Sequence, residues 1–214
     1  LLLRPELAGA LGRRGHRRLA RIYTDVACVS GYRELIHAAA AGPREVAVEA
    51  LGQIGSPAVE MLIKMVRDWD VRKYVIMALG KIRDERVLDP LMVQLRSDEF
   101  KDDATNALVE LGEPALERLV KALKDKDETV RKQAVLALGH IKHNGAVDPL
   151  IEMLADADWF TRLTAAAALE AIGDPRGRDA IKPLTKDPDM VVRMRVERIL
   201  AKWKKQPAGS VSTN

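Results

Sequence analysis

Residues 130–141 read Val-Arg-Lys-Gln-Ala-Val-Leu-Ala-Leu-Gly-His-Ile, and this pattern recurs along most of the chain. The leucines that align with Leu138 in the other copies are Leu51, Leu79, Leu108, Leu169 and Leu200, so successive copies lie 28, 29, 30, 31 and 31 residues apart. Self-similarity at this period is typical of a solenoid, in which each repeat buries its apolar face only against its neighbours.

Each repeat is predicted to contain two helices joined by a turn. The first helices, which carry the aligned leucines, are expected near 43–54, 69–82, 99–111, 128–141, 159–172 and 190–203. The second helices are expected near 57–67, 88–96, 114–124, 147–155 and 178–185. Pro57, Pro90, Pro114 and Pro149 lie near the starts of second helices, where a missing N–H costs least. The prediction is an all-α, right-handed α-solenoid (superhelix) of about five to six helical-hairpin repeats.

The composition fits such an array. Hydrophobic residues make up 47% of the chain and aromatic residues only 4%, so the core is expected to consist of Ala, Leu, Val and Ile. No apolar run approaches the roughly 20 residues of a membrane span. Leu1–Leu3 is followed at once by Arg4 and Glu6, which argues against a signal peptide. Cys28 is the only cysteine, which fits a reducing compartment, so a cytoplasmic location is expected.

Three segments are predicted: a basic N-terminal segment with a degenerate capping repeat (1–42), the repeat array (43–203) and a polar tail (204–214). The net charge of +4 belongs to the first segment, because the remainder is balanced. That segment carries an arginine cluster made of Arg13, Arg14, Arg17, Arg18 and Arg21. Its arginines form either a solvated helix face or a patch for phosphates or an acidic partner.

Two further columns recur with the leucines. Asp or Ser stands eleven residues before every aligned leucine except Leu51, where Ala40 holds that position, and its oxygen would cap the first helix. A cation follows four residues later and is expected to reach the cap of the adjoining repeat. We therefore predict a structural Asp–Arg ladder rather than an anion-binding ridge. The ladder residues are Asp68, Arg72, Asp127, Arg131, Asp158, Arg162, Asp189 and Arg193.

The motif at 130–141, together with Val-Asp-Pro-Leu-Ile at 147–151, resembles the short HEAT-like repeats first named for phycobilisome (bilin) lyases. The resemblance covers roughly 43–203. The period is shorter than the ~40–47 residues of long HEAT units, in agreement with the short type. Similar arrays include bilin-lyase subunits, archaeal and bacterial scaffolds and DNA-repair glycosylases, so the resemblance informs the fold and not the activity.

Catalytic or metal-binding chemistry has no positive support. Deoxyhypusine hydroxylase is also a HEAT-like array, and its di-iron site uses His-Glu dipeptides, but this sequence contains none. His140 and His143 lie three residues apart without a carboxylate or cysteine at a matching offset, so we expect a solvated pair. Cys28 is expected to pack in a helix face. No cofactor or metal is predicted.

Binding surfaces are the remaining signal. If the second helices line the inner curve of the solenoid, the residues between their core positions point outward and form two columns. Basic residues outnumber acidic ones in these columns, which form either a positively charged binding surface or an ordinary solvated helix face. Trp69 and Trp159 share one position in the first turn of a first helix, where they either cover a neighbouring repeat or anchor a partner. The candidate partner-binding residues are Trp69, Trp159, Lys64, Arg67, Arg96, Lys121, Lys124 and Lys182.

Three functions follow as hypotheses. The first is a non-catalytic scaffold that binds a protein or peptide partner through the inner helices and the tryptophan-bearing ridge. The second is nucleic-acid binding through the arginine cluster and the inner Lys and Arg columns. The third, implied by the resemblance, is a bilin-lyase subunit, which would bind a tetrapyrrole.

Overall fold

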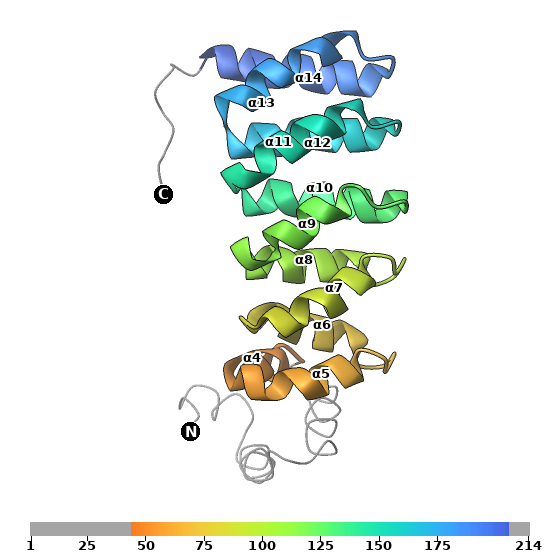
Figure 1. Ribbon diagram of the computed structural model, residues 1–214, viewed down its shortest axis with the longest axis vertical. Helices are drawn as coiled ribbons and strands as arrows, with labels where there is room; N and C mark the ends of the chain where they lie inside the picture. The colour runs from red at the N-terminus through yellow and green to blue at the C-terminus, as the bar shows by residue number, and fades with distance from the viewer. Residues whose placement is uncertain (1–43, 206–214) are drawn as a thin grey trace. The chain divides into compact units, whose positions relative to one another are not determined.

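A computed structural model describes residues 44–205, and within this range it contains helices and turns and no strand (Figure 1). The arginine cluster at 13–21, and with it the predicted capping repeat, lies outside the described residues. The first helices are α4 (Arg44–Ile54), α6 (Arg72–Lys81), α8 (Lys101–Leu111), α10 (Glu128–Ile141), α12 (Trp159–Ile172) and α14 (Met190–Lys205). The second helices are α5 (Val59–Met65), α7 (Leu88–Gln94), α9 (Leu116–Ala122), α11 (Val147–Glu152) and α13 (Pro175–Ala180). Between residues 44 and 205 the chain therefore forms five helical hairpins followed by one further first helix, which confirms the predicted all-α array of repeats.

The chain divides into two compact units. Unit 1 comprises the residues up to Gln94 together with Asn106–Leu111, and unit 2 comprises Leu95–Thr105 together with the residues from Gly112 onward. In unit 1, α6 packs against α4 and α5. In unit 2, α12 packs against α10, α11, α13 and α14, and α9 packs against α10. Within each unit, a first helix thus contacts the next first helix and the second helix that precedes it.

The aligned leucines form the centre of this packing. Leu51, Leu79, Leu108, Leu138 and Leu169 are fully buried, whereas Leu200 in α14 is half-buried. Each fully buried leucine contributes about 1.5–3 kcal/mol relative to an exposed one.

Glycines set the spacing between successive first helices. In unit 1, a Cβ added at Gly80 in α6 would lie 2.7 Å from the Cα of Ala107 in α8. In unit 2, a Cβ added at Gly139 in α10 would lie 2.8 Å from the Cβ of Ala168 in α12. The missing methyl group at these positions therefore allows the two helix backbones to approach closely, which explains why glycine follows the aligned leucine in these two repeats.

Most second helices begin with a turn of 3-10 helix, a detail that the sequence pattern did not predict. These turns are Ser56–Ala58, Glu85–Val87, Glu113–Ala115 and Asn144–Ala146. Gly55 and Gly112 precede two of them with a φ of 71°, which strongly favours glycine. The predicted start of the last second helix, residue 178, is three residues late, because Asp174 accepts the Arg176 N–H and Pro175 occupies the first helical position.

Candidate partner-binding surfaces

The ladder arginines of unit 2 bind both their own repeat and the next one. The Nη1 of Arg131 donates to the carbonyls of Asp125 (3.0 Å) and Lys126 (3.2 Å), and its Nε donates to Asp156 at 3.1 Å. Arg162 repeats this arrangement 31 residues later. It donates to the carbonyls of Asp156 (2.9 Å) and Ala157 (3.0 Å) and to both carboxylate oxygens of Asp187 at 2.8 Å. Each guanidinium thus satisfies exposed carbonyls at the end of its preceding second helix and an acid of the following repeat.

The acids of the ladder differ from the predicted ones. Asp127, Asp158 and Asp189 do act as helix caps, since they accept the backbone N–H groups of Thr129, Thr161 and Val191. The acid that receives the arginine lies two residues earlier, at Asp156 or Asp187. Its own carboxylate also accepts the N–H of the cap residue, at 2.9 Å for Asp158 and 2.8 Å for Asp189. The recurring Asp-x-Asp at 125–127, 156–158 and 187–189 was the signal that could have identified these acids.

The remaining ladder arginines bind backbone carbonyls in the same way. Arg193 donates to the carbonyls of Asp187 and Pro188 at 2.6 and 2.9 Å. In unit 1, Arg72 donates to the carbonyls of Val66 and Arg67 at 2.6 and 3.2 Å. Asp68 accepts the N–H of Asp70 at 3.3 Å, and α6 begins only at Arg72, three residues after the predicted start.

The electrostatics of the ladder agree with a structural role. The guanidinium of Arg162 holds the pKa of Asp187 below its usual value, and the N–H of Asp189 acts in the same direction. Asp187 in turn raises the pKa of Arg162. The side chains of Arg162 and Asp187 are only 11% and 4% exposed. Because these donors are engaged and nearly covered, Arg162 offers little to an external anion.

The second-helix columns are exposed as predicted but less positive than their composition suggests. In unit 1, Lys64, Arg67 and Val93 are exposed. In unit 2, each predicted cation has a carboxylate partner: Arg96 with Asp125, Lys121 with Glu117, Lys124 with Glu152 and Lys182 with Asp179, at 2.5–3.3 Å. These pairs are solvent-exposed and contribute little stability, but they neutralise the face in unit 2.

Each unit exposes one tryptophan beside a second helix. In unit 1, Trp69 is 59% exposed, and the guanidinium of Arg72 lies 5.2 Å from its ring centroid. In unit 2, Trp159 is 42% exposed and meets Phe160 edge-on, with 5.7 Å between the ring centroids. Lys132 lies 5.5 Å from the other aromatic ring, that of Phe160. The third tryptophan, Trp203 of α14, is buried.

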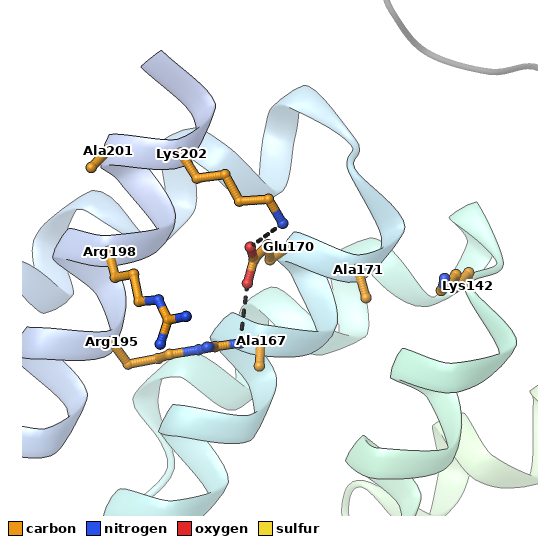
Figure 2. A pocket seen from close by; sticks show the side chains of 8 residues that line it. All are labelled: Lys142, Ala167, Glu170, Ala171, Arg195, Arg198, Ala201 and Lys202. Carbon is orange, nitrogen blue, oxygen red and sulfur yellow. Dashed lines mark hydrogen bonds and ion pairs between the residues drawn. The ribbon is translucent and has the colours of Figure 1, made fainter. Parts of the chain in front are cut away.

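A cavity in unit 2 was not predicted from the sequence. It has a volume of about 820 Å³ and is lined by Lys142, Ala167, Glu170, Ala171, Arg195, Arg198, Ala201 and Lys202. Figure 2 shows Glu170 reaching from α12 toward Arg195 and Lys202 of α14, which it binds at 3.1 and 2.9 Å. We call this the cationic cavity, because it holds four basic side chains and one acid.

Of the two neighbouring histidines, His140 is exposed and His143 has a local structural role. The Nδ1 of His143 accepts the N–H of Gly145 at 3.0 Å and caps the 3-10 turn that precedes α11. Among residues 44–205, no group of three or more His, Cys, Asp or Glu side chains could hold a metal ion. None of the helices in this range is long and apolar enough to cross a membrane.

Comparison with known families decides the identity of the repeats. The family described as HEAT repeats matches residues 32–112, 94–170 and 116–201, which together cover most of the chain. This chain belongs to the HEAT-repeat family. The HEAT repeats are of the short phycobilisome-lyase type that the period and the motif predicted.

Two curated relatives match part of this HEAT-repeat protein. Phycocyanobilin lyase subunit alpha of Picosynechococcus sp. is 31% identical over 124 residues, which are 57% of this chain and 38% of the relative. Deoxyhypusine hydroxylase of Aspergillus clavatus is 32% identical over 117 residues, which are 51% of this chain and 35% of the relative. The chain thus spans less than two fifths of the length of either relative.

A solved structure shows the same fold. The complex of CpcE and CpcF of phycocyanin lyase from Nostoc sp. PCC7120 matches with a TM-score of 0.51 and 23% identity, covering 70% of this chain and 66% of that chain. At this identity the likeness concerns the helical-repeat fold alone. The His-Glu dipeptides expected of a deoxyhypusine hydroxylase are absent from the HEAT-repeat sequence.

Proposed function

We propose that this HEAT-repeat chain is a non-catalytic interaction scaffold that binds a protein or peptide partner through its exposed second-helix faces and the tryptophan-bearing turns beside them. The observation that supports this most directly is the exposure of a large aromatic side chain in each unit, 59% for Trp69 and 42% for Trp159. Tryptophan dominates binding hot spots, because its large apolar surface becomes covered in the complex.

In unit 1 the tryptophan is continuous with the second-helix face. Arg72 lies against the Trp69 ring and also donates to the backbone carbonyls of Val66 and Arg67, at the end of α5. Lys64 in α5 and Arg67 in the turn that follows α5 are both exposed. A partner with an apolar anchor and flanking acids would therefore meet complementary groups on one surface of unit 1.

In unit 2 the tryptophan is held in place by its neighbours. Phe160 contacts the edge of the Trp159 ring, and Lys132 lies beside Phe160 while it pairs with Glu128 and Asp158. An aromatic side chain that is already fixed loses less conformational entropy when a partner covers it. The arrangement favours a preformed anchor point over a freely rotating side chain.

The test is the loss of a bound partner on tryptophan removal. The full chain and its Trp69→Ala and Trp159→Ala variants would be used to capture partners from the native source, and the partner that depends on tryptophan would then be purified. Calorimetric titration should show binding at least about tenfold weaker for either variant. Met194→Ala is the matched control, because Met194 is a 58% exposed apolar residue outside these surfaces. Equal affinity of all three variants would refute the proposal.

Nucleic-acid binding is the alternative from another class. The neutralised second-helix face of unit 2 argues against it, because phosphate contacts need cations without competing carboxylates. Titration with DNA and RNA at two salt concentrations separates the two functions. Affinity that falls steeply with salt would favour nucleic acid over a protein partner.

A bilin-lyase subunit is a second alternative, which the 31% identity to phycocyanobilin lyase subunit alpha favours. Because the chain covers 38% of that relative, this function would rest on a shared segment. Adding a bilin to the purified chain and recording its visible spectrum is a direct test. A shifted absorption band would support this alternative, and an unchanged spectrum would dismiss it.

A further inference from the structure

The cationic cavity of unit 2 carries uncompensated positive charge. Lys142, Arg195, Arg198 and Lys202 line it together with a single acid, Glu170, which gives the lining a net charge of +3. Glu170 is only 13% exposed and pairs with Arg195 and Lys202. Among residues 44–205, neither Arg198 nor Lys142 has a carboxylate within ion-pair distance.

This surplus is unusual for this molecule. The sequence from residue 43 onward is balanced in charge, and the four second-helix cations predicted to bind a partner in unit 2 each have an acidic partner. In the cationic cavity, by contrast, four cations lie around one carboxylate. Like charges at close range repel one another, so an added anion would relieve this repulsion.

The geometry shows which anion would fit. Glu170 demonstrates that a carboxylate bridges Arg195 and Lys202 at 2.9–3.1 Å. Figure 2 shows Arg198 pointing into the cavity beside Arg195, with Lys142 on the far side at the end of α10. Ala167, Ala171 and Ala201 leave the lining between these cations free of bulk. The cavity is open to solvent, and its volume of about 820 Å³ is much larger than one small anion needs.

We propose that the cationic cavity binds an acidic peptide segment of a protein partner, whose carboxylates pair with Arg195, Arg198 and Lys142. Two carboxylates on alternate residues of an extended segment lie roughly 7 Å apart, so one segment can reach cations on opposite sides of the cavity. Arginine is suited to this role, because its fork of donors matches a carboxylate. The cavity is formed by α10, α12 and α14 and shares no residue with the tryptophan surfaces, so either proposal can fail while the other holds.

The probe is a fluorescein-labelled hexaglutamate peptide, with hexaserine as the uncharged control, titrated into the full chain by fluorescence anisotropy. Hexaglutamate should bind, and its affinity should fall as salt is raised from about 50 to 300 mM.

Arg198→Glu should weaken binding about fivefold or more, and Lys142→Gln should weaken it by a smaller factor. Glu170→Gln should strengthen binding, because it removes the competing carboxylate while it preserves the shape of the side chain. Thermal melts establish whether each variant is folded. If Arg198→Glu is not folded, Lys142→Gln provides the test.

The matched control is Lys126→Glu, which makes the same charge change at an exposed lysine of unit 2 outside the cavity. An equal loss for Lys126→Glu and Arg198→Glu would overturn the proposal, because the attraction would then be non-specific. Weaker binding by a folded Glu170→Gln variant would also overturn it. Tighter binding of a single-stranded DNA of equal charge would indicate a nucleic-acid site, and displacement of the peptide by inorganic phosphate at equal charge would indicate a simple anion site. Either result contradicts the acidic-peptide proposal.

Discussion

Two arginines of unit 2 join consecutive repeats by the same set of bonds. Arg131 and Arg162 each hold two carbonyls of the turn before their own helix and a carboxylate 25 residues further along the chain. The Arg162–Asp187 pair is bidentate and nearly buried, whereas Arg176 pairs with Asp148 and Asp174 on the surface, where its side chain is 52% exposed. Similar ion pairs in this protein therefore differ widely in their importance for stability.

Arg162→Ala should lower the free energy of unfolding by on the order of 2–4 kcal/mol, because it leaves Asp187 and two backbone carbonyls without their donor. Arg176→Ala, the matched surface control, should cost about 1 kcal/mol or less. Urea denaturation followed by circular dichroism measures both values. Equal losses for the two variants would contradict the structural role of the ladder.

The ladder also predicts a pH dependence. Arg162 lowers the pKa of Asp187 in the folded protein, so this group stabilises the fold at pH values above the unfolded-state pKa of about 3.9. That stabilisation is lost as the pH falls through the lower, folded-state pKa. Urea melts between neutral pH and about pH 3 should show a decline in stability that is smaller in Arg162→Gln. An identical decline in the two proteins would show that Asp187 is not responsible.

At the scale of helices, the contact between α10 and α12 depends on a missing side chain. Gly139→Ala would place a methyl group 2.8 Å from the Cβ of Ala168 and 3.1 Å from its Cα. Forcing atoms into a packed interface costs about 1–3 kcal/mol, although alanine regains about 1 kcal/mol of helix propensity. The net expectation is a loss of stability, measured as a lower midpoint of urea denaturation.

A double-mutant cycle tests the cause. Ala168→Gly removes the opposing methyl group, so the double variant should be more stable than the sum of the two single changes predicts. Additive losses would indicate that the helices do not meet at this point. The corresponding pair in unit 1 is Gly80 with Ala107.

The sequence predicted the helices well because their signal is local. The apolar stripe and the aligned leucine place α4, α10 and α12 within a residue or two of the expected bounds. The 3-10 starts of the second helices were missed, because they depend on backbone conformation at positions such as Gly55 and Gly112. The ladder acids were missed because Arg131 and Asp156 meet only after the repeats have packed together.

The cationic cavity could not be predicted from repeat columns. The positions equivalent to Arg198 in the other repeats hold Ala167, Leu136, Asn106, Met77 and Glu49, so no periodic signal marks it. Its lining comes from three helices, and its charge arises where α14 departs from the repeat pattern. The tryptophan column, in contrast, was visible in the sequence, but only the structure shows that both side chains are exposed.

At the scale of the whole molecule, repeats pack against their neighbours. A destabilising substitution is therefore expected to affect mainly the helices around it. Leu138→Ala should lower the free energy of unfolding by about 2–5 kcal/mol, because Leu138 is fully buried at the centre of α10. Since α10 packs against α9 and α12, hydrogen exchange should accelerate first in these three helices. Peptides from α4 to α6 should keep their exchange rates.

Leu79→Ala supplies the reciprocal control, because Leu79 is the equivalent fully buried leucine of unit 1. Its effect should centre on α4, α5 and α6, which pack against one another. Hydrogen exchange followed by mass spectrometry distinguishes the two patterns. Uniform acceleration in either variant would show that the chain unfolds as one cooperative body.

The ladder has a direction, since Arg131 and Arg162 each bind an acid that lies nearer the C-terminus. A tandem duplication of residues 156–186 would supply Asp156 to the preceding Arg131 and would offer the copied Asp156 to the first copy of Arg162. The second Arg162 would still find Asp187. A chain built in this way can therefore gain a repeat without leaving any of these charges unmatched, which gives a simple physical route by which such arrays lengthen.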